Sequence, residues 1–209
     1  MADLFYKSDF KQGWIEIIIG CMFSGKTEEL IRLLRRCELS KLSFQVFKPG
    51  LDSRYSKNNV ASHNQNKFPC TIVDEAKDIL KNLNKNVDVV GIDEAQFFNE
   101  DIVDVVNELA NSGKRVIIAG LEADWKGRPF GPMPRLITLA DDIKKLHAIC
   151  MICGAPATKT QRLVREEASI LVGSTESYEA RCRRHFNPDL NIRADRMNNV
   201  SLDSTMLEL

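Results

Sequence analysis

The chain has 209 residues, 44% hydrophobic and 28% charged, which is enough to bury one sizeable core and carry a small appendage. Lysine plus arginine and aspartate plus glutamate number 29 each, and this balance argues against a general nucleic-acid-binding protein, which normally carries a basic excess. No apolar run approaches the length of a membrane span, and residues 1–12 lack the apolar centre of a signal peptide. We therefore expect a cytoplasmic protein with no membrane partner, whose six cysteines stay reduced.

Short apolar runs alternate with amphipathic stretches along most of the chain. We predict strands over 14–19, 43–48, 68–73, 87–92, 115–120 and 143–149, and helices over 26–37, 76–83 and 100–111. We predict a polar loop over 49–67 and a second loop over 122–134, whose aromatic side chains suit either a pocket wall or packing onto the core. This order predicts an α/β fold with a parallel sheet and helices on both faces.

A phosphate-binding motif follows the first predicted strand directly. Residues 20–27 match G-x-x-x-x-G-K-[ST], the P-loop, whose glycines permit a turn that points backbone N–H groups at one anion. Lys26 is placed to reach the β- and γ-phosphates of a nucleotide, and Thr27 offers a hydroxyl to Mg²⁺. The sheet is therefore predicted to be of the P-loop NTPase (RecA-like) type. Its predicted nucleotide site consists of Gly20, Cys21, Met22, Phe23, Ser24, Gly25, Lys26 and Thr27.

An acidic pair, Asp93 and Glu94, ends the apolar run 87–92. Because strands of a parallel sheet converge on the ligand at their carboxyl ends, we expect this pair beside the P-loop. Asp93 would hold Mg²⁺ directly or through water, and Glu94 would accept a proton from an attacking hydroxyl. The alternative is that the pair only caps the following helix.

Two pairs of metal-ligating residue types occur late in the chain, Cys150 with Cys153 and Cys182 with His185, each with two residues between. Four such ligands suit a closed tetrahedral zinc site, which is structural because no position is left for a substrate. The 28 residues between the pairs would then form a loop tied at its base by the metal. The alternative is unliganded core cysteines and a surface histidine.

The order of motifs is more specific than any one motif. The P-loop is followed by Asp-Glu-Ala-Gln-Phe-Phe over 93–98, by Arg-Pro-Phe-Gly over 128–131 and by the two ligand pairs. In this the chain resembles the zinc-containing thymidine kinases of the cellular type (type II), from about Gly13 to His185. The resemblance implies transfer of the γ-phosphoryl group of ATP to the 5′-hydroxyl of thymidine, with deoxyuridine as a second substrate. It also implies nucleotide salvage, feedback inhibition by dTTP and a homotetramer.

The resemblance also implies roles for individual residues. The implied catalytic residues are Glu94 as general base, Lys26 and Arg54. The implied ATP and Mg²⁺ contacts add Asp52, Asp93 and Gln96 to the P-loop. The implied thymidine contacts are Met22, Phe97, Leu121, Trp125, Phe130, Thr160, Ser169, Ile170, Leu171, Val172, Gly173 and Tyr178. The zinc-tied loop would close over the base like a lasso, mostly through backbone groups.

The chain departs from the family pattern at three positions. Trp125 stands where Phe is usual, His185 where many members have Cys, and Cys21 where Pro is common. These departures leave the reaction intact and bear only on fine specificity. The predicted domains are a nucleotide-binding domain over 1–148, a zinc-bound lasso domain over 149–190 and a disordered tail over 191–209.

Two other functions fit parts of the pattern. Asp-Glu-Ala-Gln superficially resembles the acidic box of helicases, which would make the chain a nucleic-acid-stimulated P-loop ATPase. Such motors generally need a second ATPase-like domain, for which 209 residues leave no room. The other is a zinc module that binds nucleic acid and uses nucleotide as a switch, and the balanced charge counts against it.

Overall fold

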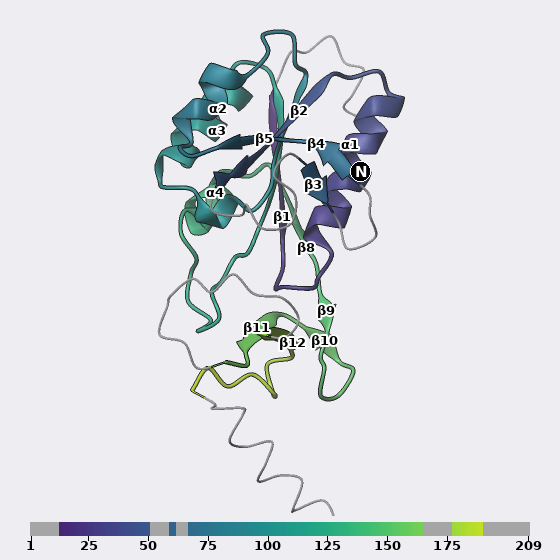
Figure 1. The fold of residues 1–209 in the computed structure, drawn as a ribbon, viewed down its shortest axis with the longest axis vertical. Coiled ribbons are helices and arrows are strands. Elements are labelled where there is room, and N and C mark those ends of the chain that lie inside the picture. Colours follow the sequence, from purple (N-terminus) through teal and green to yellow (C-terminus); the bar gives the residue numbers. More distant parts are fainter. Residues whose placement is uncertain (1–12, 51–58, 62–66, 165–176, 190–209) are drawn as a thin grey trace, which may run out of the picture. The chain divides into compact units, whose positions relative to one another are not determined.

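The computed structural model describes residues 13–50, 59–61, 67–164 and 177–189. Over these residues the chain divides into two compact units, whose helices and strands are drawn in Figure 1. Unit 1 runs up to Gly20, from Gly25 to Glu122 and from Pro129 to Leu146. Unit 2 comprises Cys21–Ser24, Ala123–Arg128 and the described residues from His147 onward.

A six-stranded sheet with the strand order β5-β2-β6-β7-β1-β8 forms the centre of unit 1. Its strands are β1 (Trp14–Ile19), β2 (Phe44–Pro49), β5 (Thr71–Val73), β6 (Val89–Ile92), β7 (Arg115–Gly120) and β8 (Asp142–Lys145). All neighbouring strands in it are parallel, and Ile17 of β1, for example, lies opposite Ile118 of β7 and Ile143 of β8. The predicted α/β fold with a parallel sheet is confirmed.

Helices cover both faces of this sheet, so its inner strands are apolar on both sides. Along β7, Val116 and Ile118 join the core on one face, while Ile117 and Ala119 join the core on the other. The first face is covered by α2 (Lys77–Asn82), α3 (Asp101–Asn111) and α4 (Met133–Leu139). Among the described helices, α1 (Lys26–Leu39) covers the second face, where Phe68 of the segment 67–69 also packs (Figure 1).

Three predicted elements in or next to unit 1 were wrong in part. The predicted loop 49–67 contains β3 (Asn59–Ala61), which pairs with β4 (Lys67–Pro69). The predicted strand 68–73 is therefore divided into β4 and β5, since Pro69 has no N–H with which to continue a ladder. The last residues of the predicted loop 122–134 belong to the first turn of α4. Two prolines there suggested a turn, but proline is tolerated at the start of a helix.

Unit 2 consists of short antiparallel strand pairs that the hydrophobic pattern did not predict. They are β9 (Ala148–Ile149) with β10 (Pro156–Ala157), and β11 (Lys159–Arg162) with β12 (Tyr178–Arg181). The predicted strand 143–149 thus divides into β8 and β9, which belong to different sheets. A small apolar cluster of Cys21, Ala148, Cys150, Ala157 and Ala180 lies at the centre of this unit.

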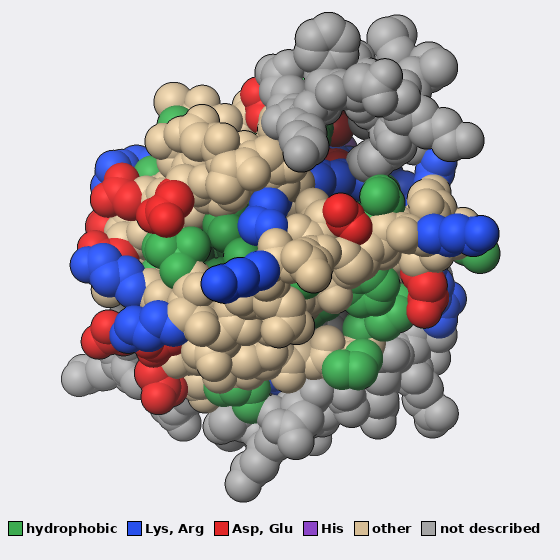
Figure 2. Space-filling view, turned by 90° about the horizontal axis from the view of Figure 1, so that it is seen from above, with side chains coloured by type: hydrophobic (Ala, Val, Ile, Leu, Met, Phe, Trp, Pro, Cys, Tyr) green, Lys and Arg blue, Asp and Glu red, His purple; other side chains and the backbone are tan. Residues whose placement is uncertain are grey.

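Acidic and basic side chains are mixed over the face of the molecule drawn in Figure 2, in keeping with their equal numbers in the sequence. Within the described ranges, no helix is long and apolar enough to cross a membrane. The predicted tail 191–209 lies outside the described residues, and the predicted domain boundaries stay predictions.

We expect Ile118→Ala to lower the free energy of unfolding by about 2–5 kcal/mol, because the side chain is 0% exposed on a central strand and its truncation leaves a cavity. Urea unfolding monitored by circular dichroism measures the change in the free energy of unfolding. The matched control is Leu39→Ala at the end of α1, where Leu39 is 84% exposed. This change should alter the free energy of unfolding by less than about 0.5 kcal/mol. Equal losses in the two variants would contradict the described core.

Candidate functional site

The P-loop joins β1 to α1 and has an unusual backbone. Gly25 is the N-cap of α1 with φ 84°, a left-handed conformation that a side chain would strain, and the helix has no side-chain cap. Phe23 is left-handed as well, with φ 67°, although it is not a glycine. Backbone strain of this kind gathers at functional sites, where the surrounding structure holds it in place. The uncapped N–H groups of α1 suit an anion.

One P-loop hydroxyl is buried with no hydrogen-bond partner in the described part of the chain. Ser24 Oγ, which belongs to unit 2, finds no hydrogen-bond acceptor or donor among the residues that the structure describes. An unpaired buried hydroxyl is costly, so a ligand oxygen in this loop would relieve it. The strained turn and this hydroxyl are both consistent with a phosphate-binding loop.

The helix that follows the P-loop contacts the carboxylate at the end of β6. Thr27 Oγ1 donates to Asp93 Oδ2 at 3.2 Å and lies 3.5 Å from Oδ1. Asp93 is buried, and its Oδ1 also accepts the N–H of Glu94 at 3.0 Å. A hydroxyl and a carboxylate so close offer the oxygen ligands that Mg²⁺ prefers. The structure therefore brings together two of the residues predicted to hold the metal.

Glu94 is fixed by a buried amide. The residue is left-handed, with φ 53°, and it precedes the short helix η3 (Ala95–Phe97) without making a side-chain cap. Its Oε2 accepts the Nε2–H of Gln96 at 2.5 Å, and Gln96 Oε1 in turn accepts the N–H of Leu121 at 2.9 Å. Gln96 was predicted to contact ATP or Mg²⁺, but in the structure both ends of its amide bind protein groups. Helix capping alone does not describe this acidic pair.

The predicted thymidine contacts fall into two groups, one in each unit. In unit 1 the rings of Phe97 and Phe130 meet edge to face, with centroids 5.6 Å apart. In unit 2 the N–H of Met22 donates to Thr160 Oγ1 at 3.1 Å. Trp125 and Tyr178 also belong to unit 2. The predicted residues Asp52, Arg54 and 169–173 lie outside the described residues.

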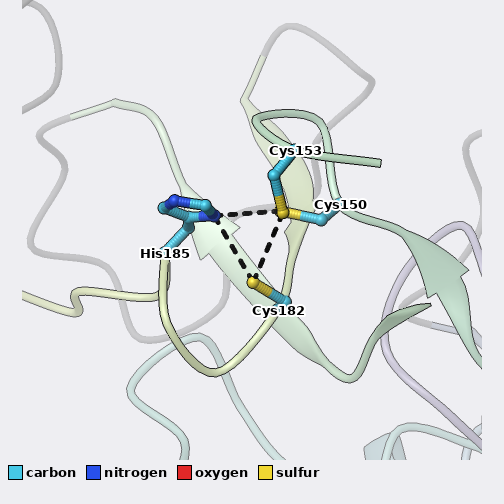
Figure 3. A group of neighbouring side chains, drawn as sticks. All are labelled: Cys150, Cys153, Cys182 and His185. Carbon is cyan, nitrogen blue, oxygen red and sulfur yellow. Dashed lines mark hydrogen bonds between the residues drawn. The ribbon is translucent and has the colours of Figure 1, made fainter. Parts of the chain in front are cut away.

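The four predicted metal ligands point toward one another in Figure 3. The ligand atoms of Cys150, Cys153, Cys182 and His185 all lie within 4.8 Å of one another. Cys153 Sγ lies 3.9 Å from Cys182 Sγ, and His185 Nδ1 lies 3.4 Å from Cys182 Sγ and 3.7 Å from Cys150 Sγ. A tetrahedral zinc ion with Zn–S bonds of about 2.3 Å holds its sulfur ligands about 3.8 Å apart. This Cys₃His cluster could therefore hold zinc.

The local surroundings of Cys150 also favour the thiolate that a metal requires. Burial raises the pKa of this thiol, but the backbone N–H groups of Cys182, Ile152 and Cys153 and the imidazole of His185 outweigh burial and lower the pKa to about 5. Deprotonated cysteine is the form that binds metal.

Among the described residues, three buried cations were missed by sequence reasoning: Lys48, Arg162 and Arg181, the last of which is paired with Glu179. Lys48 is buried at the carboxyl end of β2, next to Phe47, whose carbonyl accepts the N–H of Asp93 at 3.0 Å. Arg162 is buried at the end of β11. For Lys48 the available signal was a charge at the end of an apolar strand. For Arg162 there was none, because a lone arginine in a polar stretch reads as exposed.

The fold and these contacts define a P-loop nucleotide-binding protein of the α/β class with an attached Cys₃His cluster. The sequence model of the thymidine kinase family matches residues 13–186. The chain belongs to this family.

Two relatives cover most of the chain. The chain is 50% identical over 179 residues to a thymidine kinase of Bdellovibrio bacteriovorus, an overlap of 86% of this chain and 88% of the relative. It is 52% identical over 188 residues to a thymidine kinase of a Rhodothermus species, an overlap of 90% of this chain and 88% of the relative. The family predicted from the order of motifs is thus confirmed, and the nucleic-acid-stimulated ATPase is not favoured.

Proposed function

We propose that this chain is an ATP-dependent thymidine kinase, which converts thymidine and ATP to dTMP and ADP and also accepts deoxyuridine. The observation that carries the proposal is the contact between Thr27, at the start of the P-loop helix, and Asp93, with Glu94 next to it in sequence. The nucleoside is inferred from the two relatives, which are both thymidine kinases.

The residues of the P-loop bind the phosphates of ATP. The uncapped N–H groups of α1 and the ammonium of Lys26 offset their negative charge, and Ser24 Oγ supplies a further polar group. Thr27 and Asp93 would hold Mg²⁺. When bound there, this ion supplies positive charge to the β- and γ-phosphate oxygens.

Glu94 accepts the proton of the 5′-hydroxyl as the hydroxyl oxygen bonds to the γ-phosphorus. The bond from that phosphorus to the β–γ bridging oxygen breaks, and its electron pair leaves with ADP. The Gln96 amide holds the Glu94 carboxylate in one orientation, since its own carbonyl is fixed by the N–H of Leu121. Arg54 and Asp52 stay predicted participants.

The direct test incubates the protein with MgATP and a panel of nucleosides and identifies the products by chromatography. We expect thymidine and deoxyuridine to yield monophosphates, while purine deoxynucleosides and ribonucleosides do not react. ATP hydrolysis that requires DNA or RNA, with no nucleoside monophosphate formed, would overturn the proposed function in favour of the ATPase.

We expect Glu94→Gln to lower kcat by about 10²–10⁴, because the amide keeps the shape of the side chain and an acceptor for Gln96 but cannot take a proton. Steady-state kinetics measures kcat, and calorimetry with a nonhydrolysable ATP analogue should show unchanged nucleotide affinity. The control is Glu100→Gln, which removes an exposed carboxylate paired with Arg135 and should leave kcat unchanged. Near-normal turnover in Glu94→Gln would refute the assignment of the base.

We propose that the Cys₃His cluster binds one structural zinc ion per chain. Cys182→Ser should lose the ion and lower the thermal unfolding midpoint, because metal binding contributes to folding where the apolar core is small. Elemental analysis of the purified chain and the absorption bands of a cobalt-substituted sample measure occupancy and geometry. Cys70→Ser, a thiol outside the cluster, should keep the metal. A metal-free wild type, or full occupancy in Cys182→Ser, would contradict the site.

The remaining inferences from the family stay predictions. They are feedback inhibition by dTTP, a homotetrameric state, a cytoplasmic location, a role in nucleotide salvage and the lack of a nucleic-acid partner. The division into a nucleotide-binding domain, a zinc-bound lasso domain and a tail is likewise a prediction.

A further inference from the structure

Unit 2 buries a guanidinium group that the proposed reaction does not use. Arg162 is the last residue of β11 and is 4% exposed. A buried cation is strongly unfavourable unless hydrogen bonds and polarisable groups replace the water that it loses. The groups that contact the Arg162 guanidinium therefore indicate the role of this side chain.

The first of these groups is the hydroxyl of Tyr178. In the antiparallel pair β11 and β12, Arg162 lies directly opposite Tyr178. Nη2 and Nε of Arg162 both donate to the Tyr178 hydroxyl oxygen, at 2.9 and 3.3 Å. Arginine has no acceptor, so the tyrosine must accept in this pair and keeps its own proton for an acceptor elsewhere. Arg162 thus fixes both the position and the polarity of this hydroxyl.

The second group is the ring of Trp125. The guanidinium carbon of Arg162 lies 4.3 Å from the centroid of this ring, within the range of a cation–π contact. It also lies 5.5 Å from the ring centroid of Tyr178. One side chain therefore contacts two aromatic residues that are far apart in sequence.

The loop that carries Trp125 is itself held as a turn. Asp124 Oδ1 accepts the N–H groups of Lys126 and Arg128 at 2.8 and 2.9 Å, and the N–H of Asp124 donates to the carbonyl of Arg128 at 2.9 Å. These bonds fix the backbone on either side of Trp125 but not its ring. The contact with Arg162 restrains the ring.

We propose that Arg162 is a positioning residue that sets the affinity for the nucleoside by holding Trp125 and Tyr178 in place. This inference rests on the proposed function, in which both aromatic residues contact thymidine. Arg162 itself takes no part in phosphoryl transfer. Its loss should therefore weaken nucleoside binding while leaving the chemical step and ATP binding intact.

The experiment compares wild type, Arg162→Gln and Arg162→Lys in steady-state kinetics with each substrate varied. Arg162→Gln should raise the KM for thymidine about tenfold or more, the size expected for loss of a charge-assisted hydrogen bond. Its kcat and its KM for ATP should stay within about threefold of wild type. Arg162→Lys keeps the charge and one donor but not the planar fork, so its KM for thymidine should be intermediate. The control Arg135→Gln removes an exposed guanidinium and should match wild type.

Fluorescence gives a readout that does not depend on turnover. The chain has two tryptophans, so Trp14→Phe leaves Trp125 as the only one. In this background Arg162→Gln should change the Trp125 emission, and the thymidine concentration that half-saturates the emission change should rise by the same factor as the KM. Tyr178→Phe is a second variant, which should raise the KM for thymidine and show less than additive loss when combined with Arg162→Gln.

An unchanged KM for thymidine in both Arg162→Gln and Tyr178→Phe would overturn the inference, as would equal increases in the KM for ATP and for thymidine. In either case wild-type dTMP formation would leave the proposed function standing. A wild type that forms no dTMP would overturn the proposed function and this inference with it.

Discussion

The arrangement of Thr27 and Glu94 in unit 1 depends on the burial of the Asp93 carboxylate at the end of β6. The carboxylate lies at the edge of an apolar strand, where it must find hydrogen-bond donors to replace water. The hydroxyl of Thr27 and the N–H of Glu94 supply them. The first contact ties the start of α1 to the sheet, and the second joins the carboxylate to the N–H of Glu94, a residue with a left-handed backbone. The oxygens proposed to bind Mg²⁺ and the proposed base thus lie on either side of one buried carboxylate.

The tight packing around Gln96 explains why glycine occurs where it does in unit 1. A Cβ on Gly131, which has φ 47°, would lie 2.5 Å from the backbone carbonyl oxygen of Gln96. A Cβ on Gly120 would lie 2.7 Å from Met133 Sδ and 3.0 Å from Gln96 Oε1. Such distances leave no room for a side chain, so Gly131 lets its segment approach the backbone of Gln96, and Gly120 lets β7 approach the side-chain amide that contacts Glu94. The Arg-Pro-Phe-Gly motif therefore has a packing role, beyond any contact that Phe130 makes with a nucleoside.

The sequence predicted the parts of the fold in which buried apolar residues recur at regular intervals along a strand or helix. The apolar runs of β1 and β7 have the predicted bounds because both faces of each strand are buried. Helix α4 was missed because prolines in its first turn resemble a loop signal, although proline suits that position. The burial of Arg162 depends on a ring from another segment, and no local pattern carries that information. The Cys₃His cluster was predicted because the chemistry of zinc ligands itself fixes their spacing.

The described parts of the two units differ in the size of their apolar cores. This difference determines which of the proposed binding residues would be disturbed first. Unit 1 has two large apolar cores, one on each face of its sheet. As far as unit 2 is described, its apolar cluster consists of cysteine and alanine residues, which bury little surface. Its strands of two to four residues need a further restraint, and the Cys₃His cluster provides a suitable one because Cys182 directly follows β12. A metal held by this cluster would anchor β12 and so secure the register that sets Tyr178 opposite Arg162. Loss of that metal would then disturb the aromatic residues of unit 2 while the parallel sheet, Asp93 and Glu94 stay folded.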